Sequence, residues 1–143
     1  MTIHQISVFL ENRAGQLAEI TKILAENNID MRALSIADTA DYGVLRLIVD
    51  NCEKTTSILL AKGFILSMTP VLAVAVKNQP GGLAPILALM AENNMDVEYM
   101  YSLFLQKDDE AYMVFRVSDD AKFIALLEQN NIHIATNSEL GLQ

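Results

Sequence analysis

Residues 11–30 read ENRAGQLAEITKILAENNID, and residues 77–96 read KNQPGGLAPILALMAENNMD. Ten of the twenty aligned positions are identical at a constant shift of 66 residues. The match continues more weakly after a two-residue insertion, which changes the shift to 68 and aligns Gly63 with Asn131. Gly and Asn are the residues that best tolerate the left-handed backbone at the end of a helix. A repeat of this length indicates the duplication of a whole folding unit.

The elements of one unit follow from hydrophobic periodicity, with a period of two for strands and of three to four for helices. In the first copy we expect strand 6–10, helix 15–27, strands 31–37 and 44–49, helix 52–62 and strand 64–68. In the second copy we expect strand 71–77, helix 81–93, strands 96–105 and 111–117, helix 120–129 and strand 132–136. This order predicts an α+β fold of two tandem ferredoxin-like βαββαβ units, each a four-stranded antiparallel sheet with two helices on one face. The expected domains are residues 1–70 and 71–136, followed by a loose tail over residues 137–143.

Composition narrows the class of protein. The formal net charge of −8 disfavours binding to nucleic acid, because an acidic chain repels phosphates. No apolar run is long enough to cross a bilayer, and the N-terminus lacks the pattern of a signal peptide. The single cysteine allows no intrachain disulfide, so we expect a cytoplasmic protein. The high apolar content, 52%, predicts well-buried cores and pairing with another copy, because small units bury little surface alone.

The turns ENRAG (11–15) and KNQPG (77–81), each followed by a helix pattern, resemble the signature of the ACT domain family. The resemblance covers residues 6–136. It implies a regulatory module that binds an amino acid or a similar metabolite where two domains meet, without catalysis and without a cofactor. The chain is similar to stand-alone tandem ACT proteins. Its first unit also resembles the regulatory subunit of acetolactate synthase, so the alternative is a regulatory subunit of such a biosynthetic enzyme.

The turn before each first helix is the candidate site. A helix N-terminus offers free backbone N–H groups and a partial positive charge, which suit the carboxylate of an amino acid. Glycine allows close approach of a ligand, and an Asn amide can donate to a carboxylate. The candidate ligand-binding residues are Asn12, Arg13, Ala14, Gly15, Gln16, Leu17, Asp30 and Met31 in the first unit, and Asn78, Gln79, Pro80, Gly81, Gly82, Leu83, Asp96 and Val97 in the second. Asp30 and Asp96 are expected at the same end of the unit as the turn, where a carboxylate would pair with the ligand ammonium group.

Each of these residues also has a purely structural interpretation, which the sequence leaves open. The glycines and asparagines are ordinary turn formers, and an Asp can mark the entry to a strand. In the serine-sensing ACT domain of phosphoglycerate dehydrogenases, to which the resemblance extends, a His stands where this chain has Leu10 and Val76, so serine is not favoured as the ligand. The two turns differ in sequence, because Arg13 in the first copy is aligned with Gln79 in the second. This difference predicts two unequal sites.

Nothing in the sequence indicates an enzyme. The two histidines, His4 and His133, lie far apart in the chain and lack metal-ligand spacing, and no glycine-rich nucleotide loop is present. We therefore expect a small-molecule sensor that acts as a homodimer and modulates a metabolic enzyme partner or its own assembly. It would bind neither a membrane nor nucleic acid.

Overall fold

The computed structural model describes residues 1–11, 13–38 and 41–143. Its elements in chain order are β1 (Ile3–Glu11), α1 (Gln16–Glu26), β2 (Met31–Asp38), β3 (Tyr42–Val49), α2 (Cys52–Ala61), β4 (Leu66–Lys77), α3 (Ala84–Glu92), β5 (Val97–Lys107), β6 (Glu110–Val117) and α4 (Asp120–Gln129). The candidate residue Asn12 lies outside the described residues. The chain divides into two compact units: the first unit comprises residues 4–69 and 141–143, and the second unit comprises residues 1–3 and 70–140.

The strands form one hydrogen-bonded order, β2-β3-β1-β4-β6-β5, in a six-stranded sheet. The expectation of two separate four-stranded sheets is therefore wrong. Its cause lies in β4, which runs without interruption from Leu66 to Lys77 and contributes to both copies of the repeat. Pro70 does not end the strand, because a proline is tolerated where its missing N–H is not needed by a neighbour.

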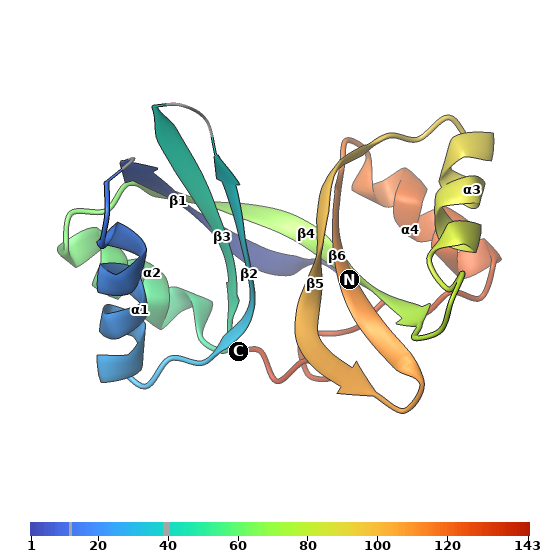
Figure 1. Cartoon of the computed structure of the whole chain (residues 1–143). Coiled ribbons are helices and arrows are strands. Elements are labelled where there is room, and N and C mark those ends of the chain that lie inside the picture. The colour runs from blue at the N-terminus through green and yellow to red at the C-terminus, as the bar shows by residue number, and fades with distance from the viewer. Residues whose placement is uncertain (12, 39–40) are drawn as a thin grey trace. The chain divides into compact units, whose positions relative to one another are not determined.

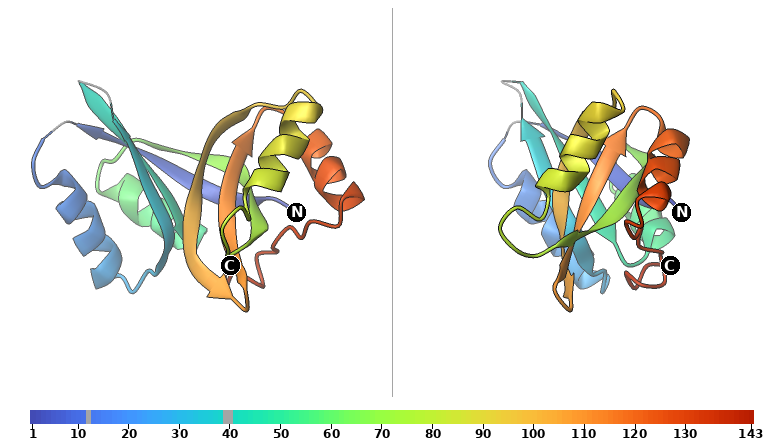
Figure 2. Two further views of the ribbon diagram at one scale, coloured as in Figure 1. Left: turned by 45° about the vertical axis from the view of Figure 1, so that its right-hand side comes forward. Right: turned by 90° about the vertical axis from the view of Figure 1, so that its right-hand side faces the viewer.

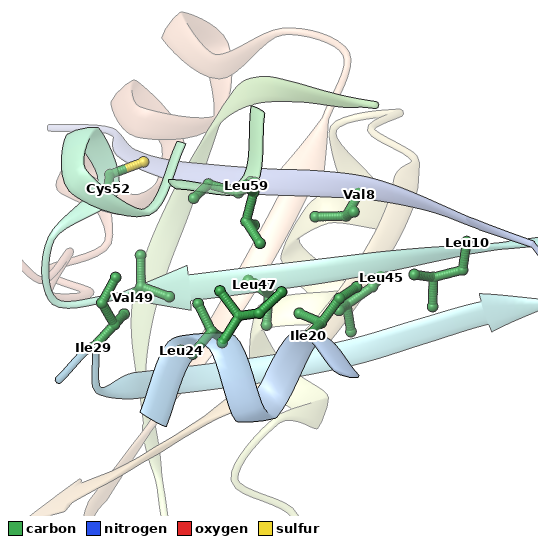
Figure 3. Close-up of a cluster of buried hydrophobic side chains, with 12 residues drawn as sticks. Val8, Leu10, Ile20, Leu24, Ile29, Leu45, Leu47, Val49, Cys52 and Leu59 are labelled. Carbon is green, nitrogen blue, oxygen red and sulfur yellow. The ribbon is translucent and has the colours of Figure 1, made fainter. Parts of the chain in front are cut away.

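The first unit places both of its helices over one face of its strands (Figure 1). Alternate residues of β1 and β3 point to this face because the side-chain period of a strand is two. Figure 3 shows Ile20 and Leu24 of α1 directed toward Leu45 and Leu47 of β3, with Leu59 of α2 beside them. All five side chains are at most 1% exposed, so this core fixes where the first turn of α1 lies relative to the end of β1.

The second unit repeats this arrangement with its own residues. In the left-hand view of Figure 2, α3 and α4 both lie on the same side of β5 and β6. Phe115 of β6 and Phe123 of α4 stand with ring centroids 5.4 Å apart, and both are fully buried. Val74 of β4 and Met90 of α3 complete the same cluster. Two aromatic rings thus fill the second core, where the first core uses aliphatic residues.

The predicted left-handed positions are confirmed. Gly63 has a φ of 87°, and its repeat counterpart Asn131 has a φ of 55°. The repeated Glu-Asn-Asn sequence, residues 26–28 and 92–94, also ends its helix with a left-handed residue. The φ values are 54° at Asn28 and 57° at Asn94. Each residue ends a helix in a conformation that an L side chain rarely adopts, and Asn is the commonest substitute for Gly there.

The C-terminal segment differs from the expectation of a strand and a loose tail. Residues 132–136 make only an isolated bridge between Ile134 and Val74, because the chain turns at Thr136. The N–H of Leu140 donates to the Thr136 carbonyl at 3.2 Å, and Leu140 is 2% exposed. The N–H of Gln143 donates to the Asp50 carbonyl at 2.8 Å, so the last residues are held and not loose.

Candidate functional site

The second unit contains a cavity of about 380 Å³ at the corner where β4 ends and α3 begins. Its walls come from the loop before α3, from the end of β4 and from the segment that follows α4. The residues that carry its chemistry are Lys77, Gln79, Gly81, Gly82, Glu110 and His133. A volume of this size falls within the range of small-molecule sites.

The first unit has a smaller cavity of about 260 Å³ at the equivalent corner. It is lined by Phe9, Leu10, Glu11, Gln16, Asp41, Tyr42, Gly63, Phe64 and Ile65. Eight of these nine positions, Asp41 being the exception, have their repeat counterparts on the wall of the second-unit cavity. The corner hollow is therefore a property of the duplicated unit and not an accident of one loop.

The helices at these two corners have no side-chain cap, whereas the other two helices do. The side chain of Asn51 accepts from the Lys54 N–H at 3.0 Å before α2, and that of Asp119 accepts from the Lys122 N–H at 3.0 Å before α4. No side-chain cap bond is present at the start of α1 or of α3. The first N–H groups of a helix need a partner, which an outside anion can supply. In α3, however, Pro85 has no N–H and the Ile86 N–H donates to the Leu83 carbonyl at 3.1 Å, so the donors left for an anion at this corner are those of Leu83 and Ala84.

The glycine turns provide open space next to these helix starts. Gly15 has a φ of 88° and Gly81 has a φ of 80°, which explains glycine at both positions. A Cβ built on either residue would meet no atom within 4 Å. The conformation, and not crowding by the protein, requires glycine here, and a ligand has room beside both turns.

At Gly82, crowding by the backbone, and not a positive φ, requires glycine. A Cβ on this residue would lie 1.9 Å from the Lys77 carbonyl oxygen. The loop is drawn against the end of β4 by hydrogen bonds from the Gln79 N–H to Lys77 and from the Gly82 N–H to Gln79, each 3.0 Å long. Helix α3 consequently begins at Ala84, three residues later than the sequence pattern predicts.

The charges of the second-unit cavity are mixed. Lys77 and His133 line it together with Glu110. His133 shares a hydrogen bond of 2.6 Å with Glu139. This hydrogen bond, assisted by the Thr136 backbone, lowers the pKa of the Glu139 carboxyl below its usual value. Helix α3 has no acidic residue in its first turn, so its own side chains do not neutralise the positive end of the helix.

The first-unit cavity is acidic in comparison. Glu11 occupies the position of Lys77, and Asp41 adds a second carboxylate. Arg13 is engaged by two carboxylates, Glu11 at 3.4 Å and Glu19 at 3.5 Å. Glu19 also lies in the first turn of α1, where it complements the positive end of the helix. This corner offers less to an anion than its counterpart does.

The expectation that Asp30 and Asp96 lie at the turn is wrong. Helix α1 separates Asp30 from Gly15, and its eleven residues rise by about 16 Å. Asp30 instead pairs with Arg32 at 2.6 Å, and its N–H donates to the Asp50 side chain at 3.0 Å. Neither aspartate lines a corner cavity, and neither do Met31 and Val97, which begin β2 and β5.

The remaining predicted residues divide between walls and supports. Gln16, Gln79, Gly81 and Gly82 line the two main cavities. Arg13 and Leu17 line an adjoining hollow of about 150 Å³ in the first unit. Residues Ala14, Gly15, Asn78, Pro80 and Leu83 form the turns without lining these hollows, and the Asn78 N–H donates to the Asp109 carbonyl at 2.7 Å.

Sequence reasoning missed the third wall of each cavity, residues 63–65 and 131–133. The aligned Gly63 and Asn131 marked these segments as helix ends, and the βαββαβ order offers the missing step. The fourth strand runs antiparallel to the first, so its beginning lies beside the end of the first strand. The hydrogen bond from the Phe9 N–H to the Ile65 carbonyl, 2.9 Å long, shows this neighbourhood.

Across residues 1–11, 13–38 and 41–143, no group of three or more His, Cys, Asp or Glu side chains is arranged to hold a metal ion. In that same part of the chain, no helix has the length and apolar character needed to cross a membrane.

The fold agrees with the comparison to known families. Residues 1–141 match the family described as an ACT domain pair, and the chain belongs to that family. The ACT domain is a regulatory fold that binds small molecules. Among curated proteins, no sequence match is found.

Solved structures give the same fold. A protein from Bacteroides thetaiotaomicron is 36% identical with a TM-score of 0.90, and the match covers 99% of this chain and 96% of that one. The ligand-free regulatory subunit of aspartate kinase from Thermus thermophilus is 15% identical with a TM-score of 0.64, over 88% and 91% of the two chains. The acetolactate synthase small subunit from Thermotoga maritima has 15% identity over 92% and 91%, but its TM-score is only 0.39.

Proposed function

We propose that this chain is a cytoplasmic amino-acid sensor whose second-unit cavity takes the carboxylate of a free amino acid at the start of α3. The bound amino acid would modulate a partner enzyme or the assembly of the chain with a second copy. The observation that carries the proposal is the pair of equivalent cavities at uncapped helix starts, in a chain that belongs to the ACT domain pair family.

The second-unit cavity suits both ends of a zwitterion. The carboxylate would accept from the Leu83 and Ala84 N–H groups at the start of α3, with Lys77 as a nearby cation. The ammonium group would pair with Glu110 on the same wall. Val76, Ile86 and Ile132 provide an apolar wall for the side chain of the ligand.

A sensor needs a difference in affinity between two states. An amino acid in the corner shifts an assembly equilibrium only if the assembled and free forms bind it unequally. A homodimer in which the second copy meets the corner would satisfy this condition, in line with the resemblance, which implies ligands where ACT domains meet. A biosynthetic enzyme that meets the same corner would be regulated in the same way.

The test is a thermal-shift screen with the twenty amino acids, followed by calorimetric titration of the best one. Binding to the folded state should raise the free energy of unfolding by about 2.7 kcal/mol at a hundredfold excess over Kd. Lys77→Ala should weaken binding about fivefold, because an exposed ion pair contributes on the order of 1 kcal/mol. The control is Lys22→Ala, which removes an exposed lysine of α1 that pairs with Glu26 at 3.8 Å and lines neither corner cavity.

The outcomes separate clearly. A shift with one or a few amino acids, reduced in Lys77→Ala and intact in Lys22→Ala, supports the proposal. No shift with any amino acid at millimolar concentration contradicts it. The regulatory part has its own readout: the dimer dissociation constant, measured by analytical ultracentrifugation, should change when the amino acid is added.

A further inference from the structure

Gln16 is the one polar side chain of the first-unit cavity that is almost fully buried, with 7% exposure. Its Oε1 atom is inaccessible to solvent and has no hydrogen-bond partner among the described residues. Buried polar atoms in native proteins nearly always have a partner, so an orphaned acceptor needs a reason. Gln16 lines both hollows of the first unit, so a rotation of its side-chain amide would present this acceptor to a ligand that carries a donor.

The repeat shows that this acceptor is specific to one corner. The counterpart of Gln16 is Gly82, which has no side chain. A side chain at Gly82 would clash with the Lys77 carbonyl oxygen. The second-unit cavity is correspondingly larger, 380 Å³ against 260 Å³. The same fold therefore presents an open corner in one unit and a corner partly filled by an amide in the other.

The other walls of the first-unit cavity favour a cation. Glu11 and Asp41 supply two carboxylates. Phe9 and Tyr42 supply two aromatic rings whose centroids are 6.0 Å apart. Carboxylates and aromatic faces both attract an ammonium group, and Gln16 Oε1 would accept one of its N–H donors. Phe64 and Ile65 leave apolar surface for a hydrocarbon chain.

We propose that the first-unit cavity is a binding site for a protonated primary amine with an apolar chain, which donates an N–H to Gln16. The inference rests on the proposed function only in treating the corners as ligand sites. The ammonium group can belong to an amino acid or to a simple alkylamine. The first unit then recognises the ammonium end alone, whereas the second unit is proposed to hold both ends of an amino acid.

Three probes with one branched carbon chain separate these cases. Isopentylamine carries only the ammonium group, isocaproate carries only the carboxylate, and L-leucine carries both. Two-dimensional amide NMR spectra of the nitrogen-labelled full chain report on each corner separately. The Gly15 amide and the Gln16 side-chain amide report on the first unit, and Gly81 and Gly82 report on the second.

Isopentylamine should move the first-unit signals more strongly than those of the second unit, where Lys77 lies on the wall beside Glu110. Gln16→Leu keeps a helix-forming side chain of similar size and should weaken isopentylamine binding at least fivefold. Gln16→Glu keeps the shape, adds a charge and should tighten it. A comparison of isopentylamine with L-leucine shows whether the carboxylate of an amino acid is tolerated in this corner.

Two results overturn the inference: isopentylamine moves no first-unit signal, or it binds Gln16→Leu and the unaltered protein equally. The proposed function fails by a different result, in which neither isocaproate nor any amino acid moves the Gly81 and Gly82 signals. An amine response confined to the first unit would support the inference even then.

Discussion

The two corner cavities share a backbone plan and differ in their chemistry. Both lie between the end of a strand, a glycine turn with positive φ and the start of a helix without a side-chain cap. The second corner is open and has Lys77 and His133 on its wall. The first corner is smaller, holds Gln16 Oε1 without a partner among the described residues and carries Glu11 where the second has Lys77. Duplication thus preserved the geometry of the corner, while substitution changed what each corner can bind.

The largest expected effect is a difference in the free energy of unfolding between alanine variants of Gly82 and Gln16, which are aligned in the repeat. Gly82→Ala places a Cβ 1.9 Å from the Lys77 carbonyl oxygen and should lower the free energy of unfolding by about 3 kcal/mol. Gln16→Ala, at the matching place in α1, should change it by less than about 1 kcal/mol. Urea denaturation followed by circular dichroism measures both. Equal losses in the two variants would show that the corners do not differ in backbone packing.

The glycines with positive φ should respond alike in both units. Gly15→Ala and Gly81→Ala should each cost about 1 to 2 kcal/mol, because the left-handed conformation is strained for an L side chain although space is available. Gly81→Asn should cost less, as the natural pair of Gly63 and Asn131 suggests. The same urea titration tests this symmetry, and an alanine variant without loss would contradict it.

The orphaned acceptor should reveal itself as a cost to stability. Gln16→Leu removes a buried polar atom without a partner and should raise the free energy of unfolding by about 1 kcal/mol. A stabilising substitution that also weakens amine binding would mark a residue kept for function. Thermal unfolding of the ligand-free protein measures it, and a clear fall in the melting temperature would show that Gln16 supports the fold.

The smallest effect concerns the wall of the second corner at low pH. The folded-state pKa of Glu139 is lowered, mainly by the hydrogen bond from His133. Its contribution to stability is therefore present above the ordinary carboxyl pKa and is lost as the pH falls through the lowered value. His133→Ala should raise the pKa of Glu139 toward its usual range, while His4→Ala should not. A carboxyl NMR titration decides, and an unchanged pKa in His133→Ala would remove His133 as the cause.

Much of this architecture was readable in the sequence, because the repeat supplied two versions of each element. The pairing of Gly63 with Asn131 predicted two left-handed helix ends, and both are present. The sheet was misjudged, because apolar alternation reveals strands but not whether one strand, here β4, continues through the join. Residues 132–136 have the composition of a strand, but the turn at Thr136, held by Leu140, stops the ladder after one bridge.

The candidate site was predicted in part. The turn residues follow from local signals, namely the glycines and the helix pattern after them. The third wall, which includes Asn131 and His133, reaches the corner because this segment pairs with β4. No local sequence pattern predicts that pairing. Asp30 was misplaced because its distance from the turn depends on the direction of α1, which crosses the unit from one end to the other.

A crystal structure of the chain grown with the amino acid that gives the largest thermal shift tests the central claim most directly. We expect the carboxylate to lie at the start of α3, within hydrogen-bond distance of the Leu83 or Ala84 N–H and close to Lys77. An amino acid bound only elsewhere, with the second-unit corner filled by water, would contradict it.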